Sequence, residues 1–558
     1  MKSKTSFFDW TVLKKDIFRF APVWAVYTIL GVLVLSTRMG SRAYIVSENL
    51  ADSIGALMGS VNCVYGIVAA LLLFGDLTNS RLCNALHSLP LRRECWFVTH
   101  FVAGILFALV PNLVLTLMLT PMLEKLWFTA FIWLLGTMLS YLFFYGTAVL
   151  AVMCTGTRFG ALTVYGLVNF VAIEVFWVVH ELILPMLYGV RISMKSFALF
   201  SPMTKLWSSY ASYFLLEDSG AINMRFAGFG EGWGYLVGIA VVGIVFSAAA
   251  LLLYRRRALE CAGDFAAIRP VKGVVTIFGS IGCGMVFRIF GYGNDALELA
   301  FLFVGIVVGF FLLQMILQRK IKVFNRKSWI CLGALVLAVV LLLILGAVDI
   351  LGIQRRVPNT AKVEKVVLGE GTISPDIIDH PGYYTNGRIT LKQPEDIRIV
   401  RAIHQELLKE PVDAEEYGTV TILYYLKNGG TLYRTYRVDV QSELFQRITA
   451  YFKGEYLFGV ADVEEIFAQR LEVEWEGYSL TRAEAETLIR KMWNDAEAGR
   501  LSQDWNSHSP ELPMTYLWMN WGSRGNTTYR SFTVWEDATE TWAYLRELEE
   551  KYDVVKIG

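Results

Sequence analysis

Residues 127–154 read WFTAFIWLLGTMLSYLFFYGTAVLAVMC and contain no charged side chain. A helix crosses the bilayer core with about 20 consecutive apolar residues, so this stretch predicts a transmembrane helix. Eight further stretches meet or approach that length, which gives nine predicted spans: 20–37, 54–75, 98–122, 127–154, 159–187, 232–254, 273–291, 297–317 and 329–351. The chain is therefore predicted to be a polytopic α-helical membrane protein.

The charge distribution predicts an orientation for these spans. Residues 1–350 carry 27 Lys and Arg against 17 Asp and Glu, whereas residues 351–558 carry 24 against 33. Of the 27 basic residues, 19 lie in the connections on the side of the N-terminus, which the positive-inside rule assigns to the cytoplasm. Nine spans then place the tail outside the cell. If the short, Gly-rich stretch 273–291 only dips into the bilayer, the tail faces the cytoplasm instead.

A cationic segment precedes the first span. In residues 1–19 and at the start of that span, the apolar side chains recur at helical spacing, with basic residues elsewhere around the helix. This pattern is typical of an amphipathic helix in the cytoplasmic interface. The alternative is a plain extension of span one. The apolar positions are Phe7, Trp10, Leu13, Ile17 and Phe20.

The connection between spans two and three is more patterned than a turn requires. It reads LCNALHSLPLRREC over residues 82–95, and its leucines favour a short helix that ends near Pro90. A helix this short is marginal in isolation, which suggests that something docks on it.

These features together resemble a known family. The chain resembles the permease subunit of type-2 exporter-class ABC transporters. The resemblance rests on an interfacial N-terminal helix, six spans within residues 20–257, the LHSLPLRRECWF segment (86–97) and the LLLYRRRALECAG segment (251–263). Residues 258–351 would add a linker and three spans, as in a bacterial subgroup with an extracytoplasmic C-terminal domain.

The resemblance implies a function and partners. In that family the loop between spans two and three is a coupling helix that fits a groove on a cytoplasmic ATPase, so the chain would have this ATPase and a second permease subunit as partners in the bacterial cytoplasmic membrane. ATP and Mg would be bound by the ATPase, and the cargo would be hydrophobic, amphipathic or peptide-like. The contact residues would be Leu86, His87, Ser88, Leu89, Pro90, Arg92 and Arg93, and the basic cluster after span six is Arg255, Arg256 and Arg257.

Other functions remain open at this stage. The patterned loop can be a solvated positive-inside connection, and the protein a non-transporting sensor or scaffold whose outer domain binds an envelope ligand. A secondary transporter would have inverted repeats, which the spans do not show clearly. The chain has no Gly-rich phosphate loop, nucleophile elbow or metal-ligand cluster, so no enzymatic role, catalytic residue or metal is expected.

Span five carries ionisable residues. Glu174 lies near mid-bilayer, where a charge is costly, and the spacing places Glu174 and Glu181 on one helix face, with Asn169 on a neighbouring face. This polar patch would line a translocation path or dimer interface, or Glu174 would be protonated and hydrogen-bonded to another helix.

The tail, residues 352–558, predicts a soluble α+β domain. Asn428-Gly429 between two strand-like runs indicates a hairpin, and Thr481 with Glu484 forms a capping box at the start of a helix. The order of strands and helices occurs twice, which suggests repeats over 360–465 and 466–558. The acidic charge of the tail argues against nucleic-acid binding.

Overall fold

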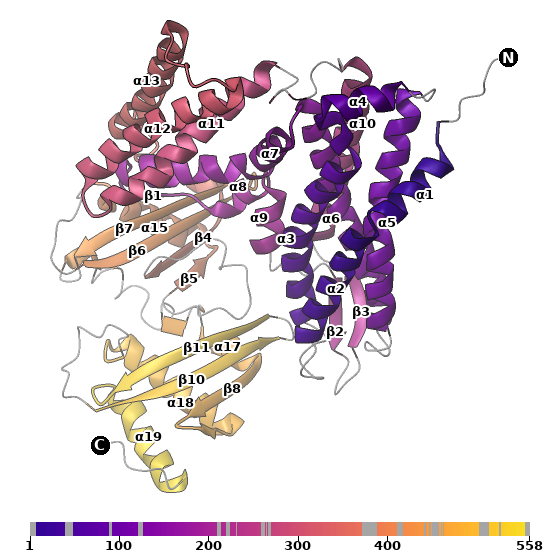
Figure 1. Cartoon of the computed structure of the whole chain (residues 1–558). Coiled ribbons are helices and arrows are strands. Elements are labelled where there is room, and N and C mark those ends of the chain that lie inside the picture. Colours follow the sequence, from indigo (N-terminus) through magenta and orange to yellow (C-terminus); the bar gives the residue numbers. More distant parts are fainter. Residues whose placement is uncertain are drawn as a thin grey trace. The chain divides into compact units, whose positions relative to one another are not determined.

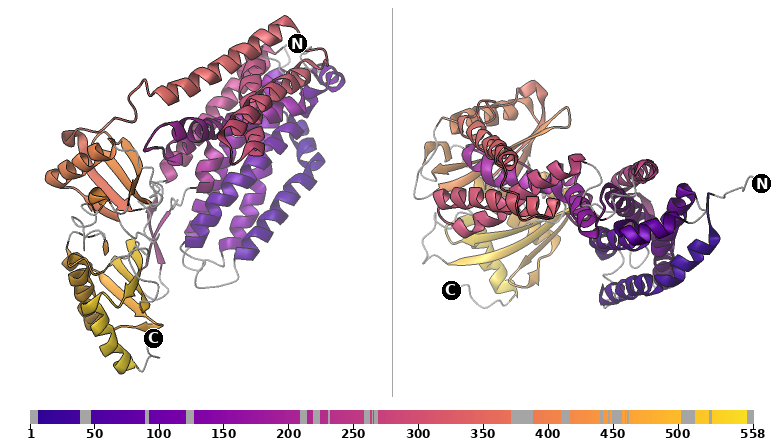
Figure 2. Two further views of the ribbon diagram at one scale, coloured as in Figure 1. Left: turned by 90° about the vertical axis from the view of Figure 1, so that its left-hand side faces the viewer. Right: turned by 45° about the horizontal axis from the view of Figure 1, so that its top comes forward.

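The computed structural model describes residues 7–38, 48–88, 92–120, 127–208, 214–218, 224–229, 232–257, 263, 265, 269–370, 388–409, 417–439, 442–445, 448, 457–458, 460, 462–501, 513–523 and 526–552. The chain forms two compact units. The first contains residues 1–178 and 195–341, and the second contains residues 179–194 and 342–558. Figure 1 and Figure 2 show the helices of the first unit and the two sheets of the second.

The first unit is built from long helices joined by short elements. The long helices are α2 (Ala21–Arg38), α3 (Glu48–Leu73), α5 (Arg93–Leu119), α6 (Trp127–Cys154), α7 (Arg158–Val178), α10 (Gly232–Arg256), α11 (Arg269–Arg288), α12 (Asp295–Gln318) and α13 (Arg326–Val348), whose end enters the second unit. The short elements are α1 (Trp10–Arg19), η1 (Gly75–Thr78), α4 (Ser80–His87), α8 (Met194–Ala198), α9 (Pro202–Ser208), η7 (Ile289–Gly291) and the hairpin β2 (Phe214–Asp218) and β3 (Met224–Phe229).

Seven of the described helices are long and apolar enough to cross a membrane: α5, α6, α7, α10, α11, α12 and α13. Helices α1 and α2 meet the same criteria only when they are taken together as a pair bent by 56°. In α3 the apolar part Gly59–Leu73 is shorter than the length that the criteria require. Each predicted span coincides with a helix, and the multi-pass architecture is confirmed. The seventh stretch, in question because of its glycines, forms a helix of spanning length.

Helix α6 packs against α3, α5, α7 and α10 through small residues. A Cβ added at Gly66 of α3 would lie 3.0 Å from the backbone of Phe144, and one at Gly146 would lie 2.4 Å from the carbonyl oxygen of Gly243. Such close backbone approaches are how helices associate in a membrane, where the hydrophobic effect gives no net drive between them.

Helices α11 and α12 form a tight pair by the same means. A Cβ at Gly305 would lie 2.8 Å from the Cα of Gly284. The turn between the helices is fixed by Asn294, which caps α12, and by an ion pair of 2.6 Å between Arg288 and Glu298. These contacts make α11 and α12 a single hairpin.

The second unit contains two antiparallel sheets. The first has the order β1-β7-β6-β4-β5 and is formed by β1 (Val190–Arg191), β4 (Val363–Glu370), β5 (Arg388–Leu391), β6 (Tyr417–Leu426) and β7 (Thr431–Asp439), with α15 (Pro394–Leu407) against it. Strand β1 comes from the connection after α7. The second unit therefore includes residues 179–194 as well as the predicted tail.

The second sheet has the order β11-β10-β8-β9. Its strands are β8 (Arg470–Trp475), β9 (Tyr478–Ser479), β10 (Met514–Ser523) and β11 (Asn526–Trp535), with helices α17 (Val463–Phe467), α18 (Arg482–Glu497) and α19 (Thr539–Tyr552). With β1 set aside, the two sheets share one strand order and one sequence of two strands, a helix and two strands. This shared topology is what a duplicated domain would have.

Two local predictions in the tail are confirmed. Strands β6 and β7 form a hairpin whose turn contains Gly429 at a φ of +79°, a conformation that glycine adopts without strain. The capping box is present, because the Glu484 carboxylate accepts a 2.9 Å hydrogen bond from the Thr481 backbone N–H.

Candidate functional site

Helix α4 lies in the connection that the sequence singled out. Asn79 caps its start and accepts a 3.0 Å hydrogen bond from the backbone N–H of Arg81. Cys83 is buried and anchors the helix, whereas Leu82 keeps 47% of its surface exposed. Helix α4 therefore has one buried position at Cys83 and an exposed apolar side chain directly beside it.

The predicted contact residues are only partly described. His87 ends α4, and Ser88 follows it, exposed, with its hydroxyl donating to the carbonyl of Ala85 at 2.7 Å. Leu89 and Pro90 lie outside the described residues, as do the side chains of Leu86 and His87. Arg92 is exposed directly before α5, and Arg93 is the first residue of that helix.

Arg93 belongs to a junction with the basic cluster after span six, called here the arginine junction (Arg93 and Arg257). The Arg257 guanidinium donates to the carbonyls of Val152 at 2.9 Å and Leu77 at 3.1 Å. Arg93 donates in turn to the carbonyl of Arg257 at 3.1 Å. The last carbonyls of a helix lack intrahelical partners, so one side chain here completes the end of α6 and ties it to η1.

The other two arginines of the cluster differ from Arg257. Arg255 forms an ion pair with Glu94 at 3.2 Å, and it is half-exposed. Arg256 points outward and is exposed. The predicted cluster therefore divides into one residue that holds helices together, one that pairs with α5 and one that faces solvent.

The turn between α6 and α7 lies beside the arginine junction. Gly263 donates its backbone N–H to the carbonyl of Gly156 at 2.8 Å. A Cβ at Gly160 would lie 2.4 Å from the carbonyl of Phe265, and one at Gly75 would lie 3.5 Å from the Arg158 guanidinium. The described residues of the connections after α3, α6 and α10 therefore meet at the α4 end of the bundle.

Helix α1 packs on α5 close to this region. Asp9 caps α1 with its side chain and donates its own N–H to the Thr99 hydroxyl at 3.1 Å. Asp16 and His100 are both buried, and their oxygen and nitrogen lie 2.7 Å apart, outside ideal hydrogen-bond geometry. Trp10 and Phe18 on the other side are each 70% exposed. The predicted amphipathic helix is present, with one face on the protein and aromatic residues on the other.

The members of the predicted polar patch have different surroundings. Asn169 is fully buried and donates to the Tyr165 carbonyl at 2.8 Å. Glu174 faces α11, where its carboxylate oxygen lies 3.4 Å from the Cβ position of Gly282. Glu181 lies in η4 (Val179–Ile183), a π-helical turn of the second unit, and contacts His180 at 3.0 Å. The π-turn changes the helical spacing on which a common face for Glu174 and Glu181 was predicted.

Sequence reasoning missed a buried polar cluster between α2, α3, α5 and α6, called here the tyrosine–asparagine cluster (Tyr27, Asn62, Tyr65 and Asn112). The Tyr27 hydroxyl donates to Asn62 at 3.1 Å, and Asn112 donates to Tyr27 at 3.2 Å. The rings of Tyr27 and Tyr65 have centroids 4.3 Å apart. Asn62 and Asn112 each lie within an apolar run of the sequence. This position could have predicted the cluster, because a side-chain amide buried in a bilayer requires hydrogen-bond partners.

Comparison of the chain with protein-family models, with curated proteins and with solved structures finds no match. Among the described residues, no group of three or more His, Cys, Asp or Glu side chains is placed to hold a metal ion.

Proposed function

We propose that the chain is the transmembrane permease subunit of an ATP-driven transporter, with a separate ATPase that docks on α4 and with a second permease subunit. The cargo would be hydrophobic, amphipathic or peptide-like. The observation that carries the proposal is the convergence of α4, the arginine junction and the α6–α7 turn at one end of the bundle.

A docking helix transmits force only if it is fixed to the helices that must move. η1, directly before α4, is linked by Arg257 to the end of α6, and Arg257 itself follows α10. Arg93 joins the start of α5 to the same point. A push on α4 would therefore reach three long helices through hydrogen bonds to backbone rather than through flexible loops. The basic residues at this end favour the cytoplasm, where an ATPase would be.

The test is to purify the full chain from its native membrane in mild detergent and measure co-purifying nucleotide hydrolysis. Leu82→Asp places a charge on the exposed side of α4 without touching its buried anchor. We expect an ATPase subunit with the wild-type chain and its loss with Leu82→Asp.

Ile321→Asp is the matched control, because Ile321 is also an exposed apolar residue, at 81%, in a connection assigned to the same side. It should retain the ATPase. If wild-type chain brings no ATPase, or if both variants lose it equally, the docking role of α4 is wrong. The sensor or scaffold function then becomes the better explanation.

A further inference from the structure

Helices cover one face of the sheet of the second tail repeat, and the other face buries Thr533 and Trp535 but exposes two aromatic residues of β10. Along β8 and β10 the side chains alternate, and Leu471, Val473, Leu517 and Met519 pack into the core beneath α18 and α19. The helices lie on that side of the sheet (Figure 1). On the other side Tyr516 is 44% exposed and Trp518 is 51% exposed. Large aromatic residues in the open on a rigid sheet are typical of binding surfaces rather than of solvated strands.

In the first repeat, apolar side chains on the equivalent face of the sheet are buried. Its residues Val367, Leu423 and Tyr433 form a buried cluster of their own, with exposures of 1%, 0% and 8%. The same topology therefore buries the apolar residues at the centre of this face in the first repeat, whereas it exposes Tyr516 and Trp518 in the second. The core of the second repeat on its helix side does not include Trp518, so the exposed ring adds nothing to that core.

Carboxylates border the exposed aromatic residues, and we call the set the aromatic face (Tyr516, Trp518, Glu472 and Glu474). Trp518 pairs across the strands with Glu474, and Asn520 pairs with Glu472. Side chains directly opposite in an antiparallel pair have Cβ atoms about 5 Å apart. The Glu472 carboxylate is bonded to Arg470 and Asn520, but within the described part of the chain no hydrogen bond or ion pair reaches the carboxylate of Glu474.

Charge decides which partner suits this surface. Residues 351–558 carry 24 Lys and Arg against 33 Asp and Glu, so anionic lipid or a second copy of the same face would be repelled. A cation above Trp518 is attracted by the ring, and the Glu474 carboxylate beside it adds to that attraction. Tyr516 continues the apolar surface along the strand, so the surface suits a chain that combines basic and apolar groups.

We propose that the aromatic face binds a basic, amphipathic polypeptide segment. A Lys or Arg side chain of the ligand stacks on Trp518 and pairs with Glu474, while its apolar side chains contact Tyr516. The proposal concerns the tail alone and does not depend on the transport function, because its binding requires neither an ATPase nor a second permease.

The test is a titration of the purified full chain, in nanodiscs of zwitterionic lipid, with a dye-labelled synthetic peptide of alternating Lys and Leu. Fluorescence anisotropy reports binding, and empty nanodiscs give the background. Its counterpart with Glu in place of Lys should not bind. Trp518→Ala should weaken binding by about tenfold, as truncation of a central aromatic residue does at interfaces.

Charge variants separate a specific contact from general attraction. Glu474→Gln and Glu465→Gln remove the same charge, but Glu465 lies on α17, whose Val463 and Ile466 pack into the core on the helix side of the sheet. Glu474→Gln should weaken binding several-fold, and Glu465→Gln should leave it nearly unchanged. Raising the salt from about 0.05 to about 0.5 M should weaken wild-type binding, because exposed charges are screened.

Four results would each overturn the proposal: no wild-type binding above that of empty nanodiscs, equal binding of the Glu-Leu peptide, equal effects of the two glutamate variants, or retained binding in Trp518→Ala. None of these results bears on α4 or on ATPase docking, so the two proposals can fail separately.

Discussion

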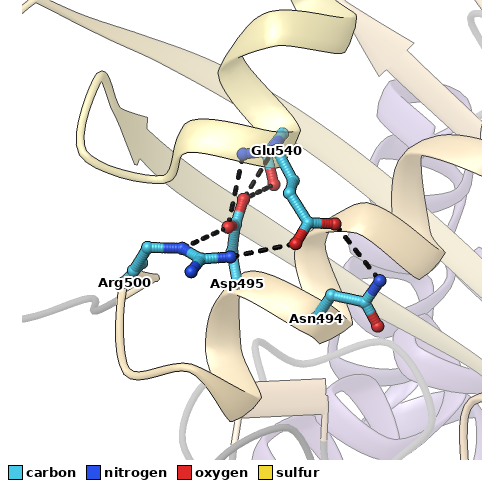
Figure 3. A network of polar contacts seen from close by, with 5 residues as sticks. Asn494, Asp495, Arg500 and Glu540 are labelled. Carbon is cyan, nitrogen blue, oxygen red and sulfur yellow. Dashed lines mark hydrogen bonds and ion pairs between the residues drawn. The ribbon is translucent and has the colours of Figure 1, made fainter.

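Substitution of Asp495 should destabilise the second tail repeat more than any nearby surface change. This carboxylate is fully buried at the end of α18 and receives donors from α19 (Figure 3). It accepts hydrogen bonds from the Thr541 backbone N–H and hydroxyl, both at 2.7 Å, and from the Glu540 N–H at 3.3 Å. Arg500 adds a fourth donor at 2.8 Å. A side chain of one helix thus caps the start of another.

The expected magnitude follows from counting the donors that each variant leaves without an acceptor. In Asp495→Asn the amide oxygen can still serve Thr541, but the NH₂ group then faces the Glu540 N–H and Arg500. Arg500 is 37% exposed and can turn to water, so the loss should be about 2 kcal/mol. Asp495→Ala also leaves the buried Thr541 N–H and hydroxyl unpaired and should cost about 4 kcal/mol.

Hydrogen exchange of the α19 amides in the purified full chain measures this opening free energy directly. The expected losses correspond to exchange about 30-fold faster for Asp495→Asn and about 1000-fold faster for Asp495→Ala. Asn494→Ala is the control, because Asn494 makes only an exposed hydrogen bond to Glu540 and should change the free energy by less than about 0.5 kcal/mol. Equal exchange rates in Asp495→Asn and Asn494→Ala would refute the reasoning.

Three further predictions concern the tail. Hydrogen bonds from Lys551 and Thr481 lower the pKa of Glu484 to about 2. The contribution of this carboxylate to stability is therefore complete above pH 4.5 and is lost as the pH falls towards 2. Glu484→Gln should remove this acid dependence from the urea unfolding of the tail. Burial, with Arg434 nearby, lowers the pKa of His404 to about 3, so the first repeat should lose about 2 kcal/mol between pH 6.5 and pH 5 as the unfolded histidine takes up its proton. Unchanged exchange of β6 over that range would contradict this. Gly189→Val should release β1 from β7, because Gly189 has a φ of +71° and its Cβ would lie 2.1 Å from the Tyr436 ring; proteolysis of residues 188–194 should accelerate, whereas Gly352→Ala, also at positive φ but in open space, should leave that segment protected.

Local patterns predicted the elements that depend on neighbouring residues alone. Hydrophobic length located the long helices, Asn428-Gly429 located a hairpin, and Thr481 with Glu484 located a helix start. Each of these signals acts within a few residues, so no tertiary contact is needed to recognise it.

The candidate site was only partly predictable. The sequence indicated the α4 connection and the arginines after span six, but it did not indicate that each of those arginines makes different contacts. Arg257 bonds to residues more than 100 positions away, and only the packed bundle decides that it, rather than Arg256, turns inward. The tyrosine–asparagine cluster escaped notice for the same reason, because Tyr27 and Asn112 meet across 85 residues.

The sequence alone determined that this is a multi-pass membrane protein with a duplicated pattern of strands and helices in an acidic tail. Only the tertiary structure decided that residues 190–191 join the tail's first sheet, that Glu181 lies in a π-turn, and that the second repeat exposes Tyr516 and Trp518. The physical reason is that periodicity reports which side of an element is apolar, whereas the partner of that side depends on contacts between distant segments.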